Sequence, residues 1–123
     1  MDKVEHMCAC GLEERTPGKY VKNALDLVIL AILNGKPMYG YKMMADIHKE
    51  FGVLLSPGSL YPLLHLLEAK KLIESHAEGG KKIYKATNEG RVRFQGALSA
   101  FRISMNQLEN FVKRNGKDSP NDL

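Results

Sequence analysis

The sequence predicts a mostly helical α+β domain with a small β-hairpin and a long final helix. Three patterns predict this class. Apolar residues recur at helical spacing in the first half of the chain, two strand-like segments flank Gly79-Gly80, and an apolar stripe at heptad spacing runs through the last third. The length of 123 residues, with 44% hydrophobic and 26% charged residues, is typical of one globular domain.

Residues 1–19 are predicted to form a flexible arm, since they lack periodicity and contain the breakers Thr16-Pro17-Gly18. Within this arm, His6, Cys8 and Cys10 place an imidazole beside two thiols, which suits a soft metal ion or the sensing of oxidation. Three ligands on a flexible arm make a weak metal site, and cysteines this close do not form a framework disulfide. We therefore expect no cofactor, and we keep a metal- or thiol-responsive regulator as an alternative.

Two helices are predicted next, over about residues 20–33 and 40–51. A glycine follows or ends each of them, as is common at helix C-termini. The first helix contains the most apolar run of the chain. That run is about half the ~20 residues needed to cross a bilayer and carries Asp26, so it is predicted to be a core helix.

A third helix is predicted to follow Ser56 and to run to about Lys71. Ser56 suits the N-cap and Pro57 the first helical position, whereas Pro62 implies a later start or an irregular first turn. One face of this helix carries a stripe predicted to be buried, formed by Leu60, Leu63, Leu64 and Leu67. The remaining surface is rich in hydroxyl groups, which makes the helix a candidate for lying in a DNA groove.

Residues 72–78 and 81–87 are predicted to be two strands joined by a Gly79-Gly80 turn. Three helices, a hairpin and a further helix follow one another in a winged helix-turn-helix. We therefore assign a DNA-binding domain to residues 20–87, with the third helix as the reading helix and the hairpin as the wing.

The final helix is predicted over residues 88–114, after a cap at Thr87-Asn88-Glu89-Gly90, with a disordered tail over residues 115–123. Its apolar residues are spaced by four and three in alternation, as in a coiled coil. The stripe could fold back onto the core of its own chain or pair with a second copy. We favour the dimer, with the helix over residues 20–33 contributing to the interface. The stripe consists of Phe94, Leu98, Phe101, Met105, Leu108 and Val112.

Several of these segments together resemble the PadR family of transcriptional regulators. They are Gly35-Lys36-Pro37-Met38-Tyr39-Gly40-Tyr41, Ser56-Pro57-Gly58-Ser59-Leu60-Tyr61-Pro62-Leu63-Leu64 and Leu72-Ile73-Glu74, within a similarity that covers about residues 23–109. The resemblance implies a homodimeric winged-helix repressor that binds operator DNA and is released by a small effector. The single C-terminal helix is similar to that of the smaller branch of the family.

Matching residues to the family indicates a set that contacts double-stranded DNA: Tyr39, Tyr41, Lys42, Ser56, Ser59, Tyr61, His65, Lys81, Lys82 and Tyr84. Each has a structural alternative. Ser56 can act only as a cap, and His65 can be a solvated surface residue. Tyr39 and Tyr41 can serve only to pack the second helix against the third. The wing lysines can protect a strand edge. In the family, effectors commonly lie at the dimer interface, so Phe94, Leu98, Phe101 and Met105 could line such a site or only close the interface.

Charge and motifs limit the other classes of function. The net charge of +4 favours an anionic partner, though only mildly. The polar N-terminus shows no secretion signal, so we expect a cytoplasmic protein that does not bind membranes. We find no glycine-rich phosphate loop, no paired carboxylates in an apolar setting and no nucleophile beside a base, and therefore expect no enzyme. A winged-helix module that binds protein is the remaining alternative.

Overall fold

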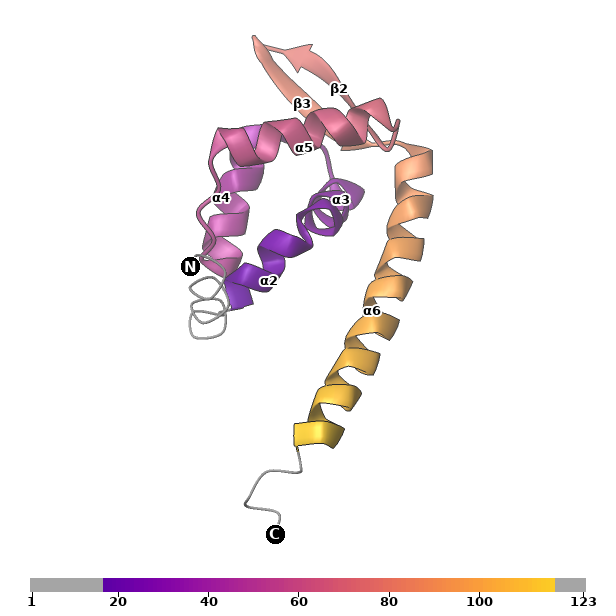
Figure 1. Ribbon diagram of the computed structural model, residues 1–123. Coiled ribbons are helices and arrows are strands. Elements are labelled where there is room, and N and C mark those ends of the chain that lie inside the picture. Colours follow the sequence, from indigo (N-terminus) through magenta and orange to yellow (C-terminus); the bar gives the residue numbers. More distant parts are fainter. Residues whose placement is uncertain (1–16, 117–123) are drawn as a thin grey trace, which may run out of the picture.

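The computed structural model describes residues 17–116, in which five helices and a three-stranded sheet surround one core (Figure 1). This order confirms the predicted mostly α winged helix. Residues 1–16, with His6, Cys8 and Cys10, lie outside the described residues. In chain order the elements are α2 (Pro17–Asn23), α3 (Leu25–Gly35), β1 (Met38–Tyr39), α4 (Gly40–Phe51), α5 (Pro57–Ala69), β2 (Ile73–Glu78), β3 (Lys81–Ala86) and α6 (Asn88–Gly116).

The first predicted helix is two helices. Helix α2 begins at Pro17, so residues 17–19 are not part of an arm as predicted, because proline at a first helical position starts a helix instead of breaking one. Ala24 has φ −115° and ψ 31° and separates α2 from α3. Helix α3 then buries Leu25, Ile29 and Leu33 in the core.

The core lies between α3, α4, α5 and the sheet, and it is built from the residues that the helical spacing predicted. Leu60, Leu64 and Leu67 of α5 are buried, and Leu63 is half-buried. Helix α4 contributes Met43 and Ile47, while the strands contribute Ile73, Tyr84 and Ala86. None of the described helices is both long and apolar enough to cross a membrane.

Both ends of helix α5 are closed by capping hydrogen bonds. The backbone N–H of Ser59 donates to Oγ of Ser56 at 3.2 Å, which confirms the predicted cap. The helix begins at Pro57, so Pro62 lies inside it and the alternative of a later start is wrong. At the C-terminus, Lys71 is left-handed (φ 64°) and Leu72 N–H donates to the carbonyl of Leu67 at 3.0 Å, a Schellman motif.

The sheet has the order β1-β3-β2 and is antiparallel throughout. Gly79 and Gly80 have φ +59° and +80°, which confirms the predicted two-residue turn between the wing strands β2 and β3. Strand β1 was not predicted. It pairs Met38 with Tyr84 and thereby attaches the start of α4 to the wing.

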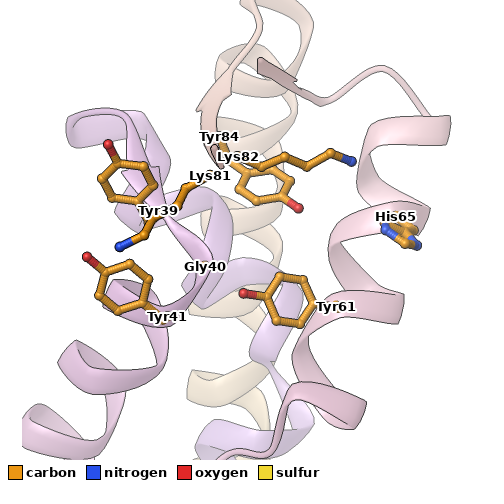
Figure 2. A pocket seen from close by; sticks show the side chains of 8 residues that line it. All are labelled: Tyr39, Gly40, Tyr41, Tyr61, His65, Lys81, Lys82 and Tyr84. Atoms are coloured by element: carbon orange, nitrogen blue, oxygen red, sulfur yellow. The ribbon is translucent and has the colours of Figure 1, made fainter. Parts of the chain in front are cut away.

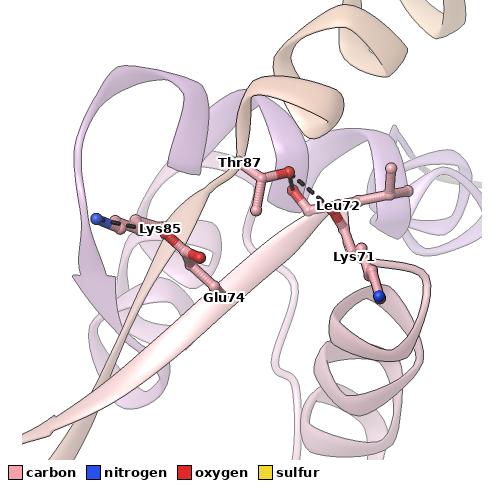
Figure 3. Close-up of polar contacts among 5 residues, drawn as sticks. All are labelled: Lys71, Leu72, Glu74, Lys85 and Thr87. Carbon is pink, nitrogen blue, oxygen red and sulfur yellow. Dashed lines mark hydrogen bonds and ion pairs between the residues drawn. The ribbon is translucent and has the colours of Figure 1, made fainter.

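The first turn of α6 is fixed to the end of α5 and the start of β2 (Figure 3). Thr87 Oγ1 lies 2.8 Å from the carbonyl oxygen of Lys71 and 3.1 Å from that of Leu72, and it accepts from Gly90 N–H at 3.0 Å. This confirms the predicted cap. A Cβ atom at Gly90 would lie 1.9 Å from the carbonyl oxygen of Leu72, so only glycine allows this close approach. Arg91 Nη1 also donates to the carbonyl of Asn34 at the end of α3, at 2.9 Å.

Beyond its first turns, α6 runs away from the core as a single long helix (Figure 1). The start of the predicted stripe packs on the core of its own chain, and the remainder does not. Phe94 packs against the core of its own chain and Leu98 is half-buried, whereas the later stripe residues are exposed. Helix α6 continues to Gly116, so residues 115 and 116 are helical and were wrongly assigned to the tail. Residues 117–123 lie outside the described residues.

Candidate nucleic-acid interface

Seven of the ten residues predicted to contact DNA line one open cavity of about 580 Å³. The start of α4, the middle of α5 and strand β3 form its walls (Figure 2). We refer to its lining as the tyrosine–lysine surface, which comprises Tyr39, Gly40, Tyr41, Tyr61, His65, Lys81, Lys82 and Tyr84.

Tyr39 and Tyr41 form the left wall in Figure 2, with the ammonium of Lys81 beside them. Their ring centroids lie 5.7 Å apart with an interplanar angle of 19°. Lys81 Nζ lies 4.8 Å from the centroid of Tyr41 and 5.9 Å from that of Tyr39, within cation–π range. The tyrosine pair therefore holds one wing cation in a defined place.

Tyr61 is positioned by Gly40. The Tyr61 ring lies over the start of α4, where a Cβ atom on residue 40 would be 2.6 Å from the Tyr61 hydroxyl oxygen and 2.9 Å from ring carbons. Only a residue without a side chain lets the ring occupy this place, half-buried and directed toward the cavity (Figure 2). Gly40 is a site residue that the sequence analysis missed, although its place between two tyrosines is a signal for it.

Tyr84 corrects a prediction. Its side chain is 1% exposed, so it packs in the core and is not displayed on the wing for DNA. Only its hydroxyl end reaches the cavity (Figure 2). Burial raises the pKa of Tyr84 above its ordinary value of 10.0, and nearby Tyr61 and Glu68 raise it further. The neutral phenol therefore forms the floor beneath the exposed members of the surface.

The other three predicted residues lie outside the cavity. Ser56 and Ser59 are exposed at the start of α5, where their hydroxyl oxygens are 3.2 Å apart and Ser56 also serves as the cap. Lys42 Nζ pairs with the carboxylate of Asp46 at 2.7 Å. Because both partners are exposed, this pair is weak and does not prevent Lys42 from meeting a phosphate.

The wing is tied to α5 by a contact that the sequence did not suggest. Ser75 Oγ on β2 donates to Oε2 of Glu68 at 2.8 Å, in a partly buried position. One residue nearer the base of the hairpin, Lys85 and Glu74 pair across the strands at 3.4 Å (Figure 3). The Ser75–Glu68 contact therefore joins the wing to α5, whereas the Lys85–Glu74 pair joins the two strands of the wing.

A second open cavity, of about 440 Å³, lies between α3 and α6. Leu27 and Leu30 line it from α3, and Ala97 and Phe101 line it from α6. Of the four residues predicted for an effector site, only Phe101 lines this cavity; Phe94, Leu98 and Met105 do not. Within residues 17–116, no three His, Cys, Asp or Glu side chains are grouped as a metal site.

Comparisons with known proteins place these features in a family. The model of the PadR-like family of transcriptional regulators matches residues 29–96. A PadR family transcription regulator from Clostridium difficile is 30% identical with a TM-score of 0.62, and the match covers 71% of this chain and 96% of that one. A PadR-like transcriptional regulator from Bacillus cereus is 27% identical with a TM-score of 0.68, covering 76% and 96%.

One curated relative is much longer. It is described as an uncharacterized 37.1 kDa protein in a Streptomyces fradiae transposon, TN4556, and is 38% identical over 60 residues. The match covers 49% of this chain but 17% of that protein, so it relates one segment of the longer protein to about half of this chain.

Proposed function

The chain belongs to the PadR-like family of transcriptional regulators, and on this basis we propose that it is a homodimeric repressor that binds operator DNA and is released by a small effector. The observation that carries the proposal is the tyrosine–lysine surface. Residues from α4, α5 and the wing meet there beside the exposed face of the second helix of a helix-turn-helix. In such motifs this helix enters the major groove while the preceding helix crosses the backbone.

The chemistry of the surface suits a nucleic acid backbone. Lys81 and Lys82 supply positive charge, and the hydroxyl groups of Tyr39, Tyr41 and Tyr61 can donate to phosphate oxygens. The cap residues Ser56 and Ser59 lie at the N-terminus of α5, where the helix dipole also favours a phosphate.

Dimerisation is supported by the distal half of α6, residues 101–116. Phe101, the first of its exposed apolar side chains, also lines the open cavity between α3 and α6. A helix from a second copy would cover both, and the resulting twofold symmetry would present two reading helices to an inverted repeat. The exposed apolar residues of the stripe are Phe101, Met105, Leu108 and Val112, with Phe111 beside them, whereas exposed Ile103 lies on the opposite side of α6.

The same cavity supports release by an effector. A small apolar molecule between Leu30 of α3 and Phe101 of α6 would contact both helices and change the angle between them. Because α6 would hold the partner copy, such a change would alter the separation of the two reading helices. A ligand acts in this way only if it binds one arrangement more tightly than the other.

The deciding experiment is selection from a random pool of DNA duplexes, with the oligomeric state measured by light scattering. We expect a dimer that enriches an inverted repeat with half-sites about one helical turn apart. A folded dimer that enriches nothing would overturn DNA recognition and favour a protein-binding winged helix. If enrichment appeared only after a metal or oxidant was added, the result would favour the alternative of a metal- or thiol-responsive regulator that uses Cys8 and Cys10.

A further inference from the structure

The outward face of α5 lacks the side chains that usually identify a base pair. Specific base contacts most often come from Arg, Lys, Asn or Gln, which can form two hydrogen bonds to one base. Helix α5 contains none of these four residue types over Pro57–Ala69. Its acidic residue, Glu68, is half-buried and accepts a hydrogen bond from Ser75. Hydrogen-bond recognition by α5 is thus restricted to Ser, Tyr and His side chains.

Apolar groups occupy much of the outward face instead, beside the exposed His65. Leu66 is 50% exposed, and Pro62, one turn earlier on the same face, is exposed as well. Gly58 and Ala69 continue this side of the helix and are also exposed. The face is therefore a narrow apolar ridge without a charged side chain.

The position of Leu66 on the helix limits what can cover it. His65, its neighbour in sequence, lines the tyrosine–lysine surface together with the wing lysines Lys81 and Lys82. An anionic backbone drawn to those lysines would bring its groove against the adjacent face of α5. In the major groove, the apolar group that a base presents is the C5-methyl of thymine.

We infer that Leu66, supported by Pro62, reads thymine methyl groups, so that each operator half-site carries thymine where it faces the middle of α5. The inference rests on the proposed function and adds the specificity that the hydroxyl-rich residues do not supply. Tyrosine and lysine contacts set the position of the protein on the duplex, and the apolar ridge distinguishes thymine from cytosine in the major groove.

The test uses the selected operator duplex and replaces thymidine by deoxyuridine one position at a time. This change removes the methyl group and keeps base pairing. With the wild-type protein, we expect the dissociation constant to rise about fourfold at one or two positions of each half-site, the size expected for one buried methyl group. Binding is measured by fluorescence anisotropy at a fixed salt concentration.

Two variants assign the effect to its residue. Leu66→Ala should bind the unmodified operator more weakly and show no further loss at the deoxyuridine positions. Leu54→Ala removes a leucine that is 77% exposed but lies before α5, so it should keep the full sensitivity. Leu66→Met keeps an apolar contact and should retain part of it.

The outcomes are separable. If no duplex is selected, the proposed function fails and this inference fails with it. If a duplex is selected but every deoxyuridine substitution leaves the dissociation constant within about twofold, the protein recognises DNA without reading methyl groups. Equal sensitivity of wild type and Leu66→Ala would assign the methyl contact to another residue and overturn the role of Leu66.

Discussion

The tyrosine–lysine surface and the distal half of α6 are both exposed, yet they differ in how the chain holds them. Around the cavity, Gly40 places Tyr61, a stacked tyrosine pair holds Lys81, and buried Tyr84 forms the floor. In the distal half of α6, the exposed side chains are apolar, with Phe101 and Met105 each 42% exposed and Phe111 57%.

The difference indicates which kind of partner each surface suits. The first surface is arranged within one chain, so a rigid polyanion can bind it with little further ordering. The second exposes large apolar side chains at coiled-coil spacing, a pattern typical of an interface between helices. The first surface therefore suits a ligand of different chemistry, whereas the second has the pattern that the proposed pairing of two like helices would cover.

The largest effect is expected on stability, at the first turn of α6, where this helix packs against the core. Gly90→Ala places a methyl group 1.9 Å from the carbonyl oxygen of Leu72, so backbone must move. We expect the free energy of unfolding to fall by about 3 kcal/mol, measured by urea denaturation. Gly96→Ala is the matched control on the same helix, because nothing lies within 4 Å of its Cβ position. It should be neutral or stabilising by up to about 1 kcal/mol, and equal stability of the two variants would contradict the close approach.

The next effect tests whether the distal half of α6 is an interface. Phe101→Ala should weaken the dimer about 30-fold, or about 2 kcal/mol, as expected for a central aromatic contact. Sedimentation velocity over a dilution series measures it. Asn110→Ala, on the opposite side of the helix from the stripe, should leave the dimer unchanged. A wild-type chain that stays monomeric and equally stable at all concentrations would remove the basis of the comparison.

A smaller effect tests whether the tyrosine–lysine surface is preorganised. Tyr61→Ala should weaken operator binding roughly tenfold, about 1.4 kcal/mol, and leave the dimer intact. Gly40→Ala keeps the phenol but displaces its ring, so it should lose most of the same affinity. Gly35→Ala, where nothing lies within 4 Å, is the control. If Gly40→Ala bound operator as well as wild type, the position of the ring would not matter. Anisotropy titrations distinguish these results.

The smallest effect concerns a single charge. Lys82→Ala should weaken binding to all sequences and reduce the slope of log affinity against log salt by about one unit. Lys85→Ala is its control, since Lys85 lies on the same strand but on the other face from Lys82 and outside the tyrosine–lysine surface. Its slope should match that of wild type. An unchanged slope for Lys82→Ala would show that this part of the wing does not contact phosphate.

Features that depend on local chemistry were predictable from the sequence. Ser56 and Pro57 start α5 and Gly79-Gly80 turns the hairpin, because a hydroxyl cap, a fixed φ and a positive φ are properties of those residues. The periods of 3.6 and 2 likewise gave the helices after residue 24 and the wing strands.

Features that depend on distant partners were not predictable. Strand β1 has two residues, too few to show alternation, and forms only because β3 lies beside it. Lys82 and Tyr84 share one side of β3, but Tyr84 lies over the core and Lys82 lies beyond it, so alternation alone could not separate them. The need for glycine at residues 40 and 90 arises from the Tyr61 ring and the Leu72 carbonyl, both distant in sequence.

The close approach at Gly90 also sets the angle at which α6 leaves the core. From that residue to Gly116 the helix extends about 39 Å at 1.5 Å per residue. A tilt of about 5° at the pivot would move the far end by about 3 Å. In a dimer joined along α6, a small change in the angle of this helix near Leu72 would therefore cause a larger change in the distance between the two reading helices. The range of half-site spacings that the dimer can bind would then depend on the start of α6, which is far from both the second copy and the bases.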